Sequence, residues 1–574
     1  MFLSLLFVLL AAYASAQEDQ NLDVEIASLG ERLRGPIART TDGFVAGKTV
    51  GQVESWFGIP YVEPPVPPNR LTAPKRLRTG YRLFNATAPP AACPQFGQPI
   101  DTTGLPEDVA LIVRNIVVVP PRMSEDCLTL NVQRPVGANR FSRLPVLVWI
   151  YGGGFETGDI ARYNGQDLVR KSMELDSDII FVAINYRLNG FGFLRGKEVA
   201  AAGASNLGLR DQRLALEWIQ DNIRNFGGDP NKVTIWGESA GAGSVFAQTV
   251  INQGDNRYKG RKLFRAAIQN SGSPSASSAV NSPASQASYD AIVLDAGCSN
   301  STDTLRCLRE VPYETYAAAV NPASGAARVF GPGFGPTDNF MPVSSIDAIQ
   351  AGNFSRVPLI QGTQEDEGTV NVFRLPGVNG TAGVVDFLAR GRASTVNRTI
   401  IEKFVSFYPN DPAAGSPFDT GSDYQLYPQY KQLAAAVGDI GQQFGRRAYN
   451  NLMAARLPAI YAYHATYNRG TSALGTYHGS DVGVLFNFRN STALPSQSGQ
   501  VYYISFVNNL DPNVIRNPRS NVTWPKFTED NKVILNFGAT ANVVEPDTYR
   551  QEAFEYWNEN ISSFKDVVAG AGKD

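Results

Sequence analysis

Six segments of the chain are continuous runs of apolar residues that end at a glycine or in a polar turn. Runs of this kind are typical of parallel strands buried on both faces of a sheet. The six segments are 144–154, 178–187, 232–237, 264–272, 357–363 and 459–467. Between two of them, residues 208–228 predict a helix whose broad apolar face comprises Leu214, Leu216, Trp218, Ile219 and Ile223. This alternation predicts the α/β fold class, with a large, mostly parallel sheet and crossover helices.

Two stretches, 275–345 and 370–450, lack the strand pattern and are irregular or helical. We expect them to be insertions that cap the sheet. No segment is rich enough in Pro, Gly or Ser to be a linker between independent domains. The sequence therefore predicts a single domain over residues 17–574.

The first 16 residues have the pattern of a secretory signal peptide. An apolar core from Phe2 to Ala12 precedes the small residues Ala14, Ser15 and Ala16, so cleavage is expected before Gln17. The alternative is a buried apolar helix, since no Lys or Arg precedes the core. No later segment has 18 uninterrupted apolar residues, and the C-terminal residues lack the hydrophobic tail of a lipid anchor. We expect a secreted protein without a transmembrane segment.

Composition excludes few functions but agrees with a folded, exported protein. The 574 residues are 43% hydrophobic and carry a formal net charge of −2, which gives no reason to expect binding to nucleic acid. An even number of cysteines behind an export signal favours disulfides, with three pairings open: Cys93, Cys127, Cys298 and Cys307. With two histidines and no metal-ligand spacing, we expect no metal site. Eight sequons suit a secreted glycoprotein: Asn85, Asn300, Asn353, Asn379, Asn397, Asn490, Asn521 and Asn560.

Ser239 lies in a pattern that can expose a nucleophile. The segment "TIWGESAGAGS" (234–244) places it between Gly237 and Gly241, after the β-branched run "KVTIW" and before the small, apolar run 240–251. A strand, a sharp turn at serine and a helix form a nucleophile elbow, in which the glycines allow strand and helix to approach closely. The alternative is a glycine-containing turn with a passive serine.

A nucleophilic serine needs a base, and the chain has two histidines. His464 lies inside an apolar strand pattern and is expected to be a packed core residue. His478 follows that strand in a Gly- and Ser-rich loop, where catalytic groups collect. A carboxylate that orients the base is offered by Glu365, Asp366 and Glu367, which follow a predicted strand, although three adjacent acids usually form a solvated turn. The residue pattern alone leaves the choice among the three open.

Backbone N–H groups for a developing oxyanion are available in two places. "YGGGFETG" (151–158) follows a strand and has no side chains at Gly152, Gly153 and Gly154. The amide of Ala240, directly after the serine, is a further donor. The glycine run does not match a phosphate-binding loop, because G-x-x-x-x-G-K-[ST] is missing.

Together these motifs make the chain resemble the type-B carboxylesterase/lipase family, which includes the cholinesterases. The matching pieces are "SEDCLTLNV", "WIYGGGFETG", "NYRLNGFGFL", residues 206–244, "QNSGS", "EDEGT" and "GTYHGSD", which occur in order over most of the chain. The resemblance is greatest to the branch of fungal secreted lipases and cholesterol esterases. It implies an α/β-hydrolase fold with capping insertions.

The resemblance also implies roles for individual residues. Ser239 matches the nucleophile, Glu367 the acid and His478 the base. The oxyanion donors match Gly153, Gly154 and Ala240, and the disulfides match Cys93–Cys127 and Cys298–Cys307. No cofactor is implied. Many relatives have histidine where this chain has Tyr151; since the donors are backbone groups, we expect activity to survive this difference, but the loop to be held differently.

The loop between Cys93 and Cys127 bears on the substrate. Its segment 105–121 places apolar residues at helical spacing: Val109, Ile112, Val113, Ile116 and Val117. In the lipase branch this loop is a mobile lid; the alternative is a helix packed permanently on the core. The loop has no tryptophan, which makes choline esters poor candidates.

The leading hypothesis is therefore a secreted serine hydrolase of lipophilic esters, such as acylglycerols or sterol esters, with transient contact to a lipid interface. A short-chain or specialised esterase is the first alternative. A non-catalytic adhesion or binding protein is the second, although such relatives lack triad residues that this chain keeps.

Overall fold

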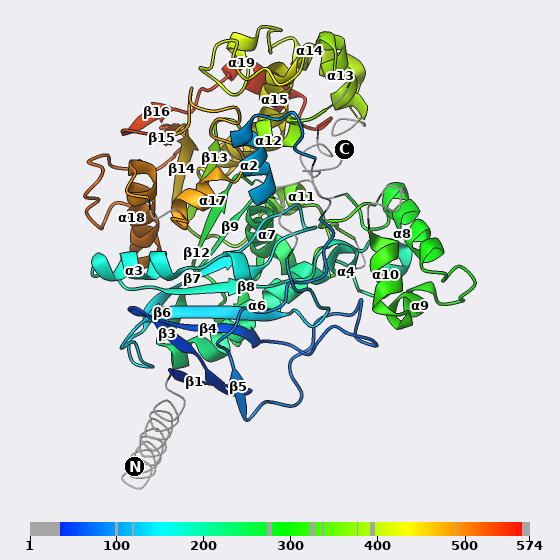
Figure 1. The fold of residues 1–574 in the computed structure, drawn as a ribbon, viewed down its shortest axis with the longest axis vertical. Helices are drawn as coiled ribbons and strands as arrows, with labels where there is room; N and C mark the ends of the chain where they lie inside the picture. Colours follow the sequence, from blue (N-terminus) through cyan, green and yellow to red (C-terminus); the bar gives the residue numbers. More distant parts are fainter. Residues whose placement is uncertain are drawn as a thin grey trace.

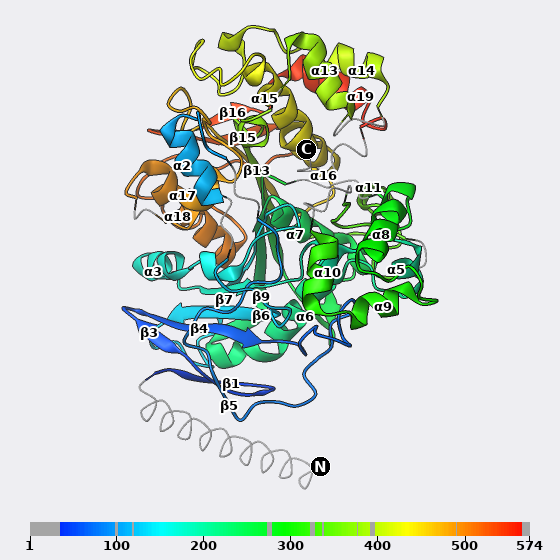
Figure 2. The same ribbon diagram turned by 45° about the vertical axis from the view of Figure 1, so that its right-hand side comes forward.

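A large mixed sheet forms the centre of the molecule, with α3 (Gln166–Glu174) and α18 (Leu494–Asn509) on one face and α6 (Leu207–Asn222) and α7 (Ala240–Val250) on the other (Figure 2). The computed structural model describes residues 35–97, 101–116, 120–272, 278–321, 328–335, 338–375, 377–390, 396–488 and 491–564. The predicted signal peptide therefore lies outside the described residues, as does Val117.

Within these residues the sheet has eleven strands. Their order is β16 (Asn542–Pro546), β15 (Val533–Phe537), β14 (Ile460–Ala465), β13 (Leu359–Gln364), β12 (Ala266–Asn270), β9 (Gly228–Glu238), β7 (Leu144–Ile150), β8 (Ile180–Ile184), β6 (Thr129–Pro135), β4 (Val53–Pro60) and β3 (Lys48–Val50). The six strands from β14 to β8 are those predicted from apolar runs, and each pairs in parallel with its neighbours among the six. The prediction of an α/β fold with a mostly parallel sheet is confirmed.

The remaining strands were not predicted, and most of them pair antiparallel. β6 joins β8 to β4, β3 closes one edge of the sheet, and β16 closes the other. Two smaller sheets comprise β1 (Ile37–Thr40), β2 (Gly43–Ala46) and β5 (Leu83–Asn85), and β10 (Arg257–Tyr258) with β11 (Arg261–Lys262).

The two stretches expected to be insertions are mainly helical and have cores of their own. The first contains α8 (Pro283–Asp295), α9 (Thr304–Glu310) and α10 (Tyr313–Val320), and its core includes Cys298. The second contains α12 (Thr369–Val372), α13 (Gly380–Arg390), α14 (Arg398–Val405), α15 (Tyr430–Gly438) and α16 (Phe444–Met453), and packs with α19 (Gln551–Glu559). Figure 1 shows the two groups at separate sides of the sheet.

The other helices are short. They are α2 (Glu107–Ile116), α4 (Asn189–Phe193), α5 (Lys197–Ala201), α11 (Ser345–Gln350) and α17 (Ser480–Leu485). Across the described ranges, no helix has the length and apolar character needed to cross a membrane.

A buried ion pair joins the end of β8 to α6. Arg187 donates to the Asp211 carboxylate through Nε and Nη2, at 2.8 and 2.7 Å, and through its backbone N–H at 3.0 Å. Both side chains are almost fully buried. Removing one partner of such a pair leaves the other charge buried without compensation.

We predict that Asp211→Ala lowers the free energy of unfolding by about 3–5 kcal/mol, because Arg187 stays buried without its counter-charge. Thermal and urea unfolding followed by circular dichroism measure the change. Glu310→Ala is the matched control, since its pair with Arg306 is exposed to solvent, and it should unfold like the parent protein. Equal unfolding of both variants would contradict the assigned role of Asp211.

Candidate active site

The turn at Ser239 is a strained connection between β9 and α7. Ser239 has φ 55° and ψ −123°, a conformation that residues other than glycine rarely adopt. A Cβ at Gly237 would lie 2.4 Å from the backbone of Gly241, and one at Gly241 would lie 2.0 Å from the carbonyl oxygen of Ile150. Both positions require glycine, because strand, helix and the end of β7 nearly touch.

A chain of hydrogen bonds joins Ser239 to residues more than 100 positions away. His478 Nε2 lies 2.8 Å from Ser239 Oγ, and His478 Nδ1 lies 2.5 Å from Glu367 Oε2. The second oxygen of Glu367 accepts the backbone N–H of Gln364 at 2.8 Å. With the proton on Nδ1, Nε2 is free to accept the serine hydroxyl proton.

The three adjacent acids do not form a solvated turn. Glu365, Asp366 and Glu367 are 2%, 0% and 0% exposed, and only Glu367 contacts His478. Asp366 instead accepts three hydrogen bonds, from the Ser416 hydroxyl and from the backbone N–H groups of Phe418 and Thr476. Because Thr476 is two residues before the histidine, Asp366 anchors the loop that carries His478.

Glu365 faces away from the imidazole, toward Arg469 at 3.3 Å. Burial, reinforced by neighbouring Asp366, raises the pKa of Glu365 to about 8. The other histidine, His464, is a buried residue of β14 whose Nδ1 lies 3.4 Å from Glu545. The prediction that His464 is a core residue is confirmed.

The glycine-rich loop after β7 packs directly on the elbow. A Cβ at Gly152 would lie 2.9 Å from the Ser239 Cβ, so this loop approaches the serine as closely as its lack of side chains allows. Gly153 and Gly154 have φ values of 112° and 64°. Ala240 is the first residue of α7, where free N–H groups and the helix dipole favour negative charge.

Two carboxylates near the histidine were missed by the sequence analysis. Glu238 precedes the serine and lies 3.4 Å from His478 Nε2; burial raises its pKa to about 8. Asp481 accepts hydrogen bonds from Asn270 and the Tyr463 hydroxyl, at 2.7 and 3.0 Å, and burial raises its pKa to about 6. The sequence signal that could have found them is their position: Glu238 directly precedes Ser239, and Asp481 follows His478 by three residues.

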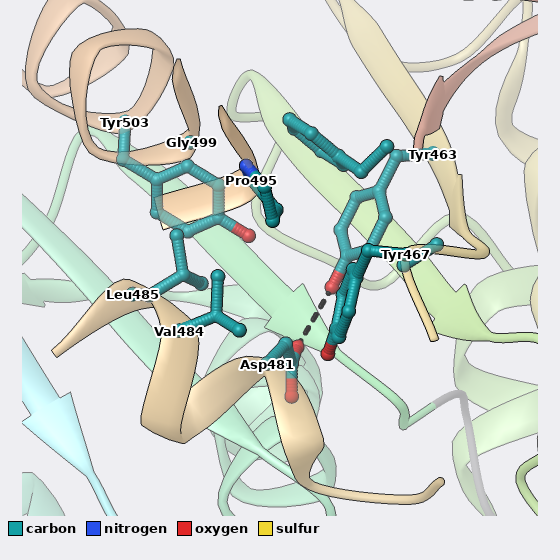
Figure 3. Close-up of a pocket in the computed structure, with 10 residues that line it drawn as sticks. Tyr463, Tyr467, Asp481, Val484, Leu485, Pro495, Gly499 and Tyr503 are labelled. Carbon is teal, nitrogen blue, oxygen red and sulfur yellow. Dashed lines mark hydrogen bonds between the residues drawn. The ribbon is translucent and has the colours of Figure 1, made fainter. Parts of the chain in front are cut away.

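A small cavity with aromatic and aliphatic walls lies against α17 and contains the Asp481–Tyr463 contact (Figure 3). Its lining residues include Tyr467, Leu485 and Tyr503. Ser239, Glu367 and His478 do not line it, so we do not assign the cavity to substrate. Across the residues that the structure describes, no cluster of His, Cys, Asp or Glu is arranged to hold a metal ion.

The disulfides pair Cys93 with Cys127 and Cys298 with Cys307. Within the first loop, α2 confirms the predicted amphipathic helix. Its Val109 and Val113 are buried against Ala473 and Leu474, just before His478 in the chain. Figures 1 and 2 both show α2 beside α17, the helix that directly follows His478 in the chain.

Comparisons with known proteins agree with this geometry. The model of the carboxylesterase family matches residues 34–557. Secreted lipase 1 of Botryotinia fuckeliana is 39% identical over 97% of this chain and 98% of its own, and the secreted triacylglycerol lipase LIP1 of Gibberella zeae is 38% identical over 92% and 91%. The crystal structure of Aspergillus niger EstA matches with a TM-score of 0.77 and 26% identity, covering 92% of this chain and 99% of that one. The chain therefore belongs to the carboxylesterase family, and its fold is that of an α/β-hydrolase.

Proposed function

We propose that the protein is a secreted serine hydrolase that cleaves lipophilic carboxylic esters. The observation that carries this proposal is the hydrogen-bonded chain from Ser239 through His478 to Glu367. Family membership and the similarity to proteins named secreted lipases support it.

In the proposed mechanism, Ser239 Oγ attacks the ester carbonyl while His478 Nε2 takes the hydroxyl proton. The buried Glu367 carboxylate keeps the other proton on Nδ1 and stabilises the imidazolium. The N–H groups of Gly153, Gly154 and Ala240 donate to the oxyanion. Each such donor contributes roughly 3 kcal/mol to lowering the barrier in related chemistry.

The second half of the reaction uses the same groups. The imidazolium gives its proton to the departing alcohol, which leaves an acyl group on Ser239. His478 then removes a proton from water, and the hydroxide attacks the acyl carbonyl. Return of the proton to Ser239 releases the carboxylic acid. The chain supplies each group that this scheme uses.

The charge state of His478 sets the working pH. Burial alone would lower the pKa of His478, but the carboxylates of Glu367 and Glu238 outweigh that effect and raise it to about 9. Because attack needs the neutral imidazole, ester hydrolysis should increase with pH as His478 loses its proton. Glu238 touches the same nitrogen that bonds the serine, so its charge affects the base directly.

The apolar contacts of α2 support a lipophilic substrate and an interface. The buried valines of α2 contact the segment before His478, so an outward movement of α2 would expose apolar surface beside the site. An exposed ion pair between Asp101 and Arg374 also holds this loop, at 2.9 Å. We propose that α2 is a lid that opens at lipid; a lid that stays packed is the short-chain alternative.

Secretion agrees with the two disulfides and with the sequons. Five sequon asparagines are exposed and two are partly buried, while Asn490 lies outside the described residues. The exposed ones are Asn85, Asn300, Asn379, Asn397 and Asn521, and the partly buried ones are Asn353 and Asn560. The Asn397 side chain caps α14 by accepting the Thr399 N–H through Oδ1, which leaves its amide nitrogen available for a glycan.

We predict that Ser239→Ala lowers kcat for p-nitrophenyl butyrate by roughly 10⁶-fold, because the nucleophile is lost. The circular dichroism spectrum and the thermal midpoint of the variant should match those of the parent protein, because alanine and serine adopt this backbone conformation at a similar cost. Steady-state assays of the purified variant measure the change. Turnover near the parent value would refute the assignment and favour a non-catalytic role for this turn.

We predict that p-nitrophenyl palmitate and emulsified triolein are hydrolysed, and that the rate rises sharply once the substrate forms an interface. The physical reason is that lipid replaces the contacts of Val109 and Val113 with Ala473 and Leu474. Initial rates below and above substrate solubility measure the effect. A preference for butyrate without any rise at the interface would support the short-chain esterase instead.

We predict that Glu238→Gln moves the acidic limb of the kcat/KM–pH profile to lower pH. The substitution removes a carboxylate 3.4 Å from Nε2 that favours the imidazolium, so His478 becomes neutral at lower pH. Glu310→Gln, an exposed change on α9, is the control and should leave the limb in place. An unshifted limb in the Glu238 variant would show that this side chain is uncharged while the histidine titrates.

A further inference from the structure

The far end of the glycine-rich loop is held by one side-chain amide from another part of the chain. Gln95 Oε1 accepts the Gly158 N–H at 3.0 Å, and Gln95 Nε2 donates to the Gly158 carbonyl at 2.9 Å. Nε2 also donates to the Cys93 carbonyl at 3.1 Å. Gln95 is buried, and it lies two residues inside the loop closed by the Cys93–Cys127 disulfide. Both backbone polar groups of Gly158 therefore depend on a single residue.

The start and middle of the same loop have other supports. The Tyr151 hydroxyl donates to the Tyr186 carbonyl at 3.2 Å, and the Tyr186 hydroxyl donates to the Tyr151 carbonyl at 2.7 Å. The two rings are stacked, with centroids 4.5 Å apart. In the middle, the backbone N–H of Asn189 donates to the Phe155 carbonyl at 2.7 Å. Tyr151 thus holds the loop through a reciprocal tyrosine pair.

Gly158 is connected to the proposed oxyanion donors through a hydrogen bond within the loop. The Gly153 carbonyl accepts the N–H of Thr157, the residue before Gly158, at 3.0 Å. Gly158 also has φ 121°, and a Cβ there would lie 2.4 Å from the Tyr151 ring. The turn is closed against that ring, so a shift of Gly158 is passed through Thr157 to Gly153.

We propose that Gln95 is a positioning residue for the oxyanion hole, which it ties to the base of the Cys93–Cys127 loop. The inference rests on the proposed function, because it concerns the amides of Gly153 and Gly154 as donors to the transition state. Gln95 itself touches no reacting atom. In this proposal its amide keeps the loop in place, so that both N–H groups can donate to the carbonyl oxygen of the ester that Ser239 attacks.

Gln95→Met tests this proposal, because methionine has a similar length and lacks hydrogen-bonding groups that could hold Gly158. Gln133→Met is the matched control. Gln133 is equally buried, and its amide accepts the Gly165 N–H at 2.7 Å and donates to Asn164 at 2.8 Å, so it holds a different turn. The readouts are kcat and KM for p-nitrophenyl butyrate, the inhibition constant of an alkylboronic acid that forms a tetrahedral adduct, and the thermal midpoint.

We expect Gln95→Met to lower kcat by about 10–100-fold and to raise the inhibition constant of the boronic acid by a similar factor. KM should stay nearly unchanged, because the donors act on the tetrahedral state. Gln133→Met should lower the thermal midpoint and keep the parent kcat. Should Gln95→Met fail to fold, Gln95→Asn keeps a buried amide that is too short to bridge Gly158, and it should show the same loss of kcat.

A Gln95 variant that loses thermal stability like the Gln133 variant, but keeps the parent kcat and boronic acid affinity, would overturn the inference. That result leaves the proposed function intact as long as the parent protein turns over and Ser239→Ala does not. A parent protein that neither hydrolyses the ester nor binds the boronic acid would instead mark failure of the proposed function.

Discussion

The backbone of Ser239 is held in a conformation that an isolated peptide rarely adopts, and the rest of the site is built around it. Strain of this kind costs about 1–3 kcal/mol and persists only where the surroundings compensate for it. Here the Ser239 N–H donates to the Asn270 carbonyl at the end of β12, and the Ser239 carbonyl accepts the Gly243 N–H in the first turn of α7. The neighbouring strand and helix therefore force the serine side chain out toward His478.

A second constraint is the burial of several carboxyl groups around one imidazole. Asp366 holds the chain before His478, and Asp481 holds α17 behind it through Asn270 and Tyr463. Glu367 and Glu238 contact the imidazole nitrogens themselves. Asp366 and Asp481 thus fix the segments before and after His478, while Glu367 and Glu238, which contact the imidazole, raise its pKa.

Much of the fold could be predicted because each buried parallel strand is a continuous run of apolar residues in the sequence. β7, β8, β9, β12, β13 and β14 are continuous apolar runs, which predicted parallel strands but not their order in the sheet. The internal strands β6 and β4 and the edge strand β16 pair antiparallel with their neighbours, and their pairing was not predicted from the sequence. The sequence left open whether the acidic turn after β13 is solvated, because nothing in its composition reveals that α15 packs against it.

The sequence by itself determined the strand–turn–helix at Ser239 and left His478 as the only histidine in a loop, since both depend on local pattern and on a count of two histidines. Resemblance to a family was needed to choose Glu367, and the structure brings that carboxylate rather than its neighbours to the imidazole. Only the tertiary structure decided that α2 covers Ala473 and Leu474, that Glu238 reaches the base and that Gln95 holds Gly158. Most of these contacts join segments that are distant in the chain, and the direction of the Glu238 side chain is set by packing. Neither kind of contact produces a periodic pattern in the sequence.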